Sequence, residues 1–174
     1  MNHPLAISIA QAEDLLPLVE LAFRCTKAMK EIGIDQWDEL YPSQTDFELD
    51  IKSQTLYLVR REEWTVACAV LNTQQEPEYA TVDWEYTLPP IGVVHRLMVD
   101  PKAQGEGIAR LLMSFVEERA ARLGLNSIRL DAFLKNPRAL ELYERLGYRT
   151  AGTVTFRKGI FRCFEKKLTQ TKKE

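Results

Sequence analysis

Histidine and cysteine are scarce in this chain of 174 residues. The sequence holds two histidines, His3 and His95, and three cysteines, Cys25, Cys68 and Cys163. Two histidines do not make a histidine-rich metal site, and the scattered cysteines lack the spacing of a zinc site or of a disulfide framework. We therefore expect no metal, and we expect reduced and mostly buried thiols, as in cytoplasmic proteins.

Long apolar runs and an excess of either charge are also missing. No stretch is apolar enough to span a bilayer, and residues 1–20 lack the basic start and apolar core of a secretory signal. The formal net charge is −2, which gives no basic surface for nucleic acid. We expect a cytoplasmic protein that binds neither nucleic acid nor membrane. The length predicts one domain over residues 1–174, with a polar tail from about residue 169, and the apolar content of 45% is ordinary for a soluble globular protein.

The most informative stretch runs from residue 93 to residue 112, where a strand, a glycine turn and a helix are expected in succession. Residues 93–99 are apolar and β-branched, and Asp100-Pro101 ends the strand because proline cannot continue a ladder. Gly105 and Gly107 then precede apolar residues at helical spacing. Such a turn directs the amides of a helix N-terminus at an anion, which fits a pyrophosphate site. It fits equally an ordinary tight turn.

The rest of the chain predicts a mixed α/β order. Strands are expected over residues 5–9, 54–60, 64–71, 127–133, 148–156 and 160–168, and helices over 11–32, 45–52, 108–123 and 136–146. We expect Thr45 as an N-cap with Glu48 completing a capping box, and residues 79–86 as a further extended segment. The strands at 93 and 127 must be parallel, with a right-handed crossover. The expected fold is a mixed, mostly antiparallel sheet of about six or seven strands with helices on both faces.

A second motif, from Asn136 to Tyr148, reads N-P-R-A-L-E-L-Y-E-R-L-G-Y. Together with the glycine turn, it resembles the GNAT superfamily of acyl-CoA-dependent N-acyltransferases. The turn matches the family pattern Gln/Arg-x-x-Gly-x-Gly/Ala, and the later stretch matches Asn-x-x-Ala-x-x-Leu-Tyr-Glu-x-x-Gly followed by Phe or Tyr. The specific motifs lie within residues 93–148. The segment 33–42 also resembles an uncharacterised bacterial subgroup of this family.

The resemblance implies a GNAT-like fold that uses acetyl-CoA as co-substrate, without a metal. The pyrophosphate would bind the turn made of Gln104, Gly105, Glu106, Gly107, Ile108 and Ala109. The pantetheine arm would pair with the strand edge at Leu97, Met98 and Val99, and would contact Asn136. Tyr143 would lie near the sulfur and protonate the departing thiolate.

The general base does not carry over from the family, because many relatives have a glutamate where this chain has Val93. His95 shares a strand face with Val93, and its pKa range suits proton acceptance near neutral pH. It fits a structural histidine equally well. Further candidates, acting directly or through a water molecule, are Asp83, Glu85 and Asp131. We expect the neighbouring Arg96 to point to the other face and to be structural or to form a salt bridge.

In this family, the helices and loop of residues 20–45 usually border the acceptor site, which implies Trp37 and Tyr41 as parts of the acceptor pocket. Trp84 and Asp131 are further predicted members of this pocket. The aromatic residues fit the hydrophobic core equally well. The expected activity is transfer of an acetyl group from acetyl-CoA to a primary amine of a small molecule or peptide, by a monomer or a homodimer. The alternative is a non-catalytic acyl-CoA-binding or sensing module, which would not need the phenol of Tyr143. A fold does not identify the acceptor.

Overall fold

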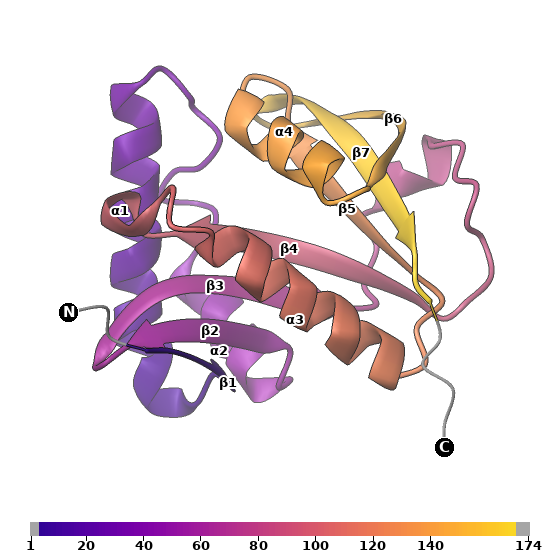
Figure 1. Cartoon of the computed structure of the whole chain (residues 1–174). Coiled ribbons are helices and arrows are strands. Elements are labelled where there is room, and N and C mark those ends of the chain that lie inside the picture. The colour runs from indigo at the N-terminus through magenta and orange to yellow at the C-terminus, as the bar shows by residue number, and fades with distance from the viewer. Residues whose placement is uncertain (1–3, 170–174) are drawn as a thin grey trace. The chain divides into compact units, whose positions relative to one another are not determined.

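The computed structural model of the protein describes residues 4–169, and Figure 1 shows the arrangement of their elements. The chain forms two compact units. The first comprises the residues up to Leu71 with Arg96–Ser114, and the second comprises Asn72–His95 with the residues from Phe115 on. One strand and one helix are therefore divided between the units, and the last residue of a second strand, Asn72, also lies in the second unit. The expected polar tail lies, apart from Thr169, outside the described residues.

Strands and helices follow the order expected from the sequence. The strands are β1 (Leu5–Ile9), β2 (Leu56–Arg61), β3 (Trp64–Asn72), β4 (Ile91–Val99), β5 (Ser127–Phe133), β6 (Arg149–Phe156) and β7 (Gly159–Lys167). The helices are α1 (Leu15–Glu31), α2 (Gln44–Lys52), α3 (Ile108–Arg122) and α4 (Pro137–Arg145). Short 3-10 helices are η1 (Ala12–Asp14), η2 (Pro77–Thr81) and η3 (Pro101–Ala103).

Within the described part of the chain, seven strands form one mixed sheet in the order β1-β2-β3-β4-β5-β7-β6. The pairs β1–β2, β2–β3, β5–β7 and β6–β7 are antiparallel. β4 and β5 are parallel, with Ile91 opposite Ser127 and Val93 opposite Arg129. α3 supplies the crossover that a parallel pair requires. The predicted α/β class with a mixed, mostly antiparallel sheet is confirmed.

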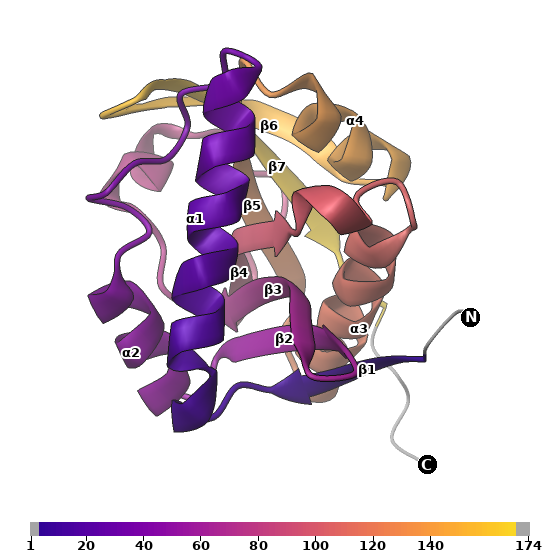
Figure 2. The same ribbon diagram turned by 90° about the vertical axis from the view of Figure 1, so that its left-hand side faces the viewer.

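The core of the first unit lies between α1, α2 and the strands β2 and β3. Leu18, Leu21 and Cys25 recur at helical spacing on α1 and pack with Leu56 and Leu58, which alternate along β2. Figure 2 shows α1 and α2 beside these strands. Each fully buried leucine contributes about 1.5–3 kcal/mol, so this face fixes how α1 and α2 pack.

The expected capping of α2 is wrong by two residues. The N-cap is Ser43, whose hydroxyl accepts a hydrogen bond from the Asp46 amide at 3.2 Å, while the Ser43 amide donates to the Asp46 carboxylate at 2.7 Å. The sequence offers two overlapping capping boxes, one starting at Ser43 and one at Thr45. The earlier box forms because Ser43 has extended backbone and Thr45 is already helical.

The extended segment expected over residues 79–86 is also wrong. Residues 77–81 form η2, which begins at Pro77, and the hydroxyl of Thr81 donates to the Glu78 carbonyl at 2.8 Å. The indole of Trp84 donates to the Tyr79 carbonyl at 2.9 Å. These local hydrogen bonds satisfy backbone groups that a strand would have paired with a neighbour, so the segment folds on itself.

A buried ion pair joins α2 to β4 in the first unit and confirms the expected salt bridge of Arg96. The guanidinium donates to both carboxylate oxygens of Asp50, at 2.8 and 2.7 Å, and to the hydroxyl of Tyr41 at 2.9 Å. Both partners of the pair are at most one-tenth exposed. Arg96 has a φ of 52°, a left-handed conformation that is uncommon outside glycine and turns its side chain toward α2.

We expect Asp50→Asn to lower the free energy of unfolding by about 3 kcal/mol, because it leaves the buried Arg96 charge without a counter-charge. Urea denaturation followed by circular dichroism measures this change. The control is Glu141→Gln, which removes an exposed pair with Arg145 and is expected to cost less than about 0.5 kcal/mol. Equal losses in the two variants would show that the buried pair does not hold α2 to β4.

Candidate functional site

The glycine turn lies in the first unit, between β4 and α3. Its start is fixed by Asp100, a fully buried residue whose carboxylate accepts from the Lys102 amide at 2.9 Å and pairs with Arg24 at 2.6 Å. Gly105 and Gly107 have φ values of 85° and 81°. Left-handed backbone of this kind favours glycine, so the turn needs a glycine at each of these two positions.

The turn is open to an approaching anion. Residues 104–107 are exposed, and a Cβ placed on Gly105 or Gly107 would meet nothing within 4 Å. Among residues 4–169, no backbone acceptor pairs with the amides of residues 105–107. The one acidic side chain of the turn, Glu106, forms an ion pair with Arg61. Free amides at the positive end of α3 fit a pyrophosphate, so these residues could hold the phosphates of acetyl-CoA.

The end of β4 precedes this turn in the same unit. Met98 points into the core beside α1 and is 2% exposed, whereas its neighbours Leu97 and Val99 are half-buried. Because side chains alternate along a strand, Leu97 and Val99 face away from that core. The Val99 carbonyl accepts hydrogen bonds from the amide of Gln104 at 3.2 Å and from the thiol of Cys25 at 3.4 Å. The side chain of Gln104 therefore holds the glycine turn against the strand.

The two aromatic residues predicted for the acceptor pocket in the first unit differ in their surroundings. Trp37 is 8% exposed and belongs to the cluster that α1 and α2 form with the sheet. Tyr41 is 36% exposed, and its ring lies 5.6 Å from the guanidinium of Arg96. Trp37 has the packing of a core residue, whereas Tyr41 presents part of its ring to solvent. Contact of either ring with an acceptor stays a prediction.

The second unit holds Tyr143, which α4 places against β7. The ring is 6% exposed and packs on Phe164 and Tyr148, with ring centroids 5.6 and 5.9 Å apart. Burial and the nearby Asp131 raise the pKa of Tyr143 well above its usual value. The phenol is therefore a neutral proton donor at physiological pH. Asn136, at the start of the same helix, is the N-cap and accepts from the Ala139 amide at 3.3 Å.

Asp131 lies on β5 with its carboxylate toward η2. The hydroxyl of Tyr79 donates to this carboxylate at 2.7 Å. Burial raises the pKa of Asp131 to about 6, while the hydrogen bond from Tyr79 acts in the opposite direction. A carboxylate with this pKa is ionised at neutral pH yet basic enough to accept a proton.

Asp131 and Tyr143 lie on opposite faces of β5. Phe164 on β7 is opposite Leu130, so both of these side chains share the face that Tyr143 packs against. Asp131 follows Leu130 directly and therefore points to the other face, where Tyr79 binds it. An acid and a base are thus separated by the thickness of one strand.

His95 is half-buried at the end of the β4 segment in the second unit. Its Nε2 lies 3.1 Å from the side-chain oxygen of Asn72 and 3.2 Å from the carbonyl of Gln74. A carbonyl only accepts, so Nε2 carries the proton and donates to the loop after β3. The other expected acidic residues are more exposed: Asp83 is exposed, and Glu85 pairs with Arg149 at 3.1 Å.

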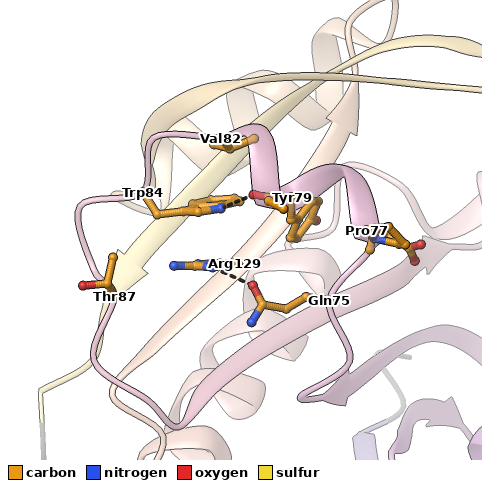
Figure 3. Close-up of a pocket in the computed structure, with 9 residues that line it drawn as sticks. Gln75, Pro77, Tyr79, Val82, Trp84, Thr87 and Arg129 are labelled. Atoms are coloured by element: carbon orange, nitrogen blue, oxygen red, sulfur yellow. Dashed lines mark hydrogen bonds between the residues drawn. The ribbon is translucent and has the colours of Figure 1, made fainter.

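A pocket of about 430 Å³ opens on the second unit, and Figure 3 shows its lining. Trp84, predicted for the acceptor site, forms part of its wall. Sequence reasoning missed the adjacent Arg129, whose guanidinium lies 4.2 Å from the centre of the Trp84 ring, and it also missed Tyr79. Arg129 could have been found from the sequence. It stands two residues before Asp131 in an apolar strand, so the two side chains must lie on the same face of the sheet.

The three cysteines are buried and free, as expected. Burial raises the pKa of Cys25 and of Cys163 to about 12, so neither thiol is a ready nucleophile. Across residues 4–169, no group of three metal-ligating side chains comes together. Within the same range, every helix is too short or too polar to cross a membrane.

Comparison with known proteins agrees with the motifs. The acetyltransferase (GNAT) family model matches residues 20–148. The S-(2-succino)cysteine N-acetyltransferase of Bacillus subtilis (strain 168) is 26% identical over 166 residues, covering 91% of this chain and 93% of that protein. The IAA acetyltransferase of Azospirillum brasilense is 28% identical over 119 residues, covering 66% of this chain and 70% of that protein.

Solved structures show the same fold. A GNAT-family acetyltransferase from Streptococcus agalactiae has a TM-score of 0.85 at 19% identity and covers 96% of each chain. The PaiA N-acetyltransferase from Thermoplasma acidophilum, solved in complex with coenzyme A, has a TM-score of 0.73 at 18% identity, covering 94% of this chain and 99% of that chain. With the family model matching most of its length, the chain belongs to the acetyltransferase (GNAT) family of acetyl-CoA-dependent acyltransferases.

Proposed function

We propose that the protein transfers the acetyl group of acetyl-CoA directly to a primary amine of a small molecule. The observation that carries this proposal is the placement of Asp131 and Tyr143 on opposite faces of β5. Amine acetylation needs one group that removes a proton from the amine and another that protonates the departing thiolate. A binding module would need neither, which favours catalysis over the alternative of an acyl-CoA sensor.

The residues of the first unit serve the co-substrate in this proposal. The amides of residues 104–109 bind the pyrophosphate, and the edge of β4 at Leu97–Val99 pairs with the pantetheine arm, as the family motif implies. The family motif also assigns Asn136, in the second unit, to the co-substrate. Bound acetyl-CoA supplies a thioester, which is an acyl group already activated for attack by an amine. The protein then has to position two groups and move two protons.

Asp131 is the proposed base. An amine arrives mostly protonated at neutral pH, and it must lose this proton before its nitrogen can attack. The carboxylate of Asp131 faces the pocket side of β5, has a pKa of about 6, and is held by Tyr79. Both features suit a group that first binds the ammonium form and then accepts its proton. His95, with its Nε2 hydrogen directed at the loop after β3, is the alternative base.

Tyr143 is the proposed acid. Its raised pKa keeps the hydroxyl protonated, and the three rings of Tyr143, Tyr148 and Phe164 hold the phenol in one orientation. A thiolate is a stronger base in a low-dielectric site than in water, so proton donation from the phenol lowers the barrier to its departure.

A small-molecule acceptor is supported by the relatives. The Bacillus subtilis protein is named for S-(2-succino)cysteine, and mycothiol acetyltransferases of Mycobacteroides abscessus and Acidothermus cellulolyticus match shorter stretches, at 42% identity over 65 residues and 44% over 73. The pocket of the second unit, at about 430 Å³, is large enough to admit a small molecule.

The phosphate role of the glycine turn predicts that Gly107→Glu lowers CoA affinity at least tenfold, measured by isothermal titration calorimetry. The substitution places a negative charge and a side chain where free amides would meet phosphate oxygens. Gly124→Glu is the matched control, because Gly124 has a φ of 78° and equally open surroundings at the other end of α3. Similar CoA affinities for the two variants would contradict the assignment.

The acid role predicts that Tyr143→Phe lowers single-turnover acetyl transfer by about 10²–10⁴, with a much smaller change in CoA affinity. The change removes one hydroxyl and almost no volume. Tyr148→Phe is the control, since it makes the same change in the adjoining ring. A rate for Tyr143→Phe within about threefold of the parent would remove this phenol from the mechanism.

The base role predicts a pH profile. Asp131 accepts a proton only when ionised, so kcat/KM should rise with pH and level off above about pH 6. Asp131→Asn should abolish this limb. Tyr79→Phe should move this rise to higher pH. The hydrogen bond from Tyr79 lowers the pKa of Asp131, so its loss in the variant raises that pKa. A limb that survives Asp131→Asn and disappears in His95→Gln would assign the base to His95 instead.

A further inference from the structure

Arg129 is a buried cation that forms no ion pair among the described residues. It is 6% exposed, and no carboxylate in residues 4–169 forms an ion pair with it. The neighbouring carboxylate of Glu165, on β7, is already paired with Arg149 and accepts from the amides of Glu85 and Tyr86. Glu165 lies opposite Arg129 and favours its charged form, but this carboxylate is shared with Arg149, so the charge of Arg129 is only partly compensated. A partly compensated buried charge is costly, so such a site favours the arrival of an anion.

The guanidinium also has unused hydrogen-bonding capacity. It donates to the side-chain oxygen of Gln75 at 2.5 Å and to the carbonyl of Tyr86 at 3.1 Å, and its Nε–H finds no partner among the described residues. Figure 3 shows the planar group beneath Trp84 and directed along the pocket toward Gln75. Stacking on the indole fixes the plane of the group, which is the arrangement that favours carboxylate recognition by arginine.

The position of Arg129 relative to the proposed base further restricts the class of ligand that the pocket could bind. Arg129 and Asp131 are two residues apart on β5, so both side chains point to the same face, about 7 Å apart along the strand. Tyr79 links the two, because its ring lines the pocket and its hydroxyl donates to Asp131. Glu76 also lines the pocket, and it lies close enough to Asp131 to raise the pKa of that carboxyl. The lining therefore carries one cation, Arg129, and one carboxylate, Glu76, on the side of Asp131.

We propose that Arg129 binds a carboxylate of the acceptor, so that the acceptor is an amino acid or a similar amine carrying a carboxylate. The amino group of the acceptor lies toward Asp131 and its carboxylate toward Arg129. The apolar walls formed by Val82, Ala80 and Pro77 are left for the remainder of the molecule. This inference rests on the proposed acetyl transfer and adds the substrate class to it.

The test uses the full-length protein, acetyl-CoA and a panel of natural α-amino acids. For each amino acid that is acetylated, kcat/KM is also measured for its carboxamide and for the amine that lacks the carboxyl group, such as L-phenylalaninamide and phenylethylamine. We expect the parent to favour the acid about 10- to 100-fold, which is the worth of a charge-assisted hydrogen bond. Arg129→Gln should remove this preference, so that the ratio of kcat/KM for the acid to kcat/KM for the carboxamide falls to about one.

Arg122→Gln is the matched control, since it removes one arginine charge from an exposed position on α3 in the same unit. Arg129→Lys should keep part of the preference, because it retains the charge without the planar fork. Dividing the acid-to-carboxamide ratio of kcat/KM in the parent by the same ratio in the variant cancels the different basicities of the amines. If Arg129→Gln still preferred the acid over the carboxamide, Arg129 would not be the group that binds the carboxylate.

A measurement on the parent protein alone guards against misfolding of the variants. Calorimetry should show that N-acetyl-L-phenylalanine, or the N-acetyl form of the best amino acid, binds at least tenfold more tightly than its carboxamide. Acetylation of simple amines with no use of amino acids would refute the carboxylate inference and leave acetyl transfer intact. Selective binding of the N-acetyl acid without acetylation of any amine would refute the transfer and support the anion site.

Discussion

The carboxylate of Glu165 has no exposed surface, and the loop that walls the pocket depends on it. It accepts hydrogen bonds from the amides of Glu85 and Tyr86 at 2.9 and 3.0 Å and pairs with Arg149. The Tyr86 carbonyl in turn accepts from Arg129. Tyr86 is thus tied to β7 through its amide and to β5 through its carbonyl. Because an unpaired buried carboxylate is costly, release of this loop is unfavourable, and a segment without regular structure becomes a rigid wall.

Alternation along β5 separates the proposed acid from the proposed base. Side chains of consecutive residues lie on opposite faces of the sheet, so Leu130 packs with the group around Tyr143 while Asp131 faces η2. Burial raises the pKa of both groups, yet the carboxylate still ionises below neutral pH and the phenol stays protonated. Two titrating groups whose environments keep them in complementary protonation states are the usual arrangement for acid–base catalysis.

Local patterns predicted much of the fold and the part of the site that depends on short spacing. The glycine turn at 104–109 and the helix beginning after Asn136 were both placed correctly, because their geometry is set by residues a few positions apart. The start of α2 was missed because Ser43 and Thr45 both satisfy the capping pattern, and backbone conformation decides between them. The hydrogen bond between Tyr79 and Asp131 joins residues 52 positions apart through a 3-10 helix, and no local spacing encodes it.

Charged residues inside apolar strands are the signal that could have found the rest of the site. Burial of an ion in a central strand costs several kcal/mol unless it is paired, so each such residue requires a partner or a ligand. In β5, Arg129 and Asp131 share one face, and in β7 Glu165 is opposite Arg129. Glu165 is paired within the protein, whereas Arg129 has no carboxylate partner among the described residues and Asp131 is held by a neutral phenol. The two incompletely neutralised ions on this strand therefore identify the face on which a dipolar ligand would be bound.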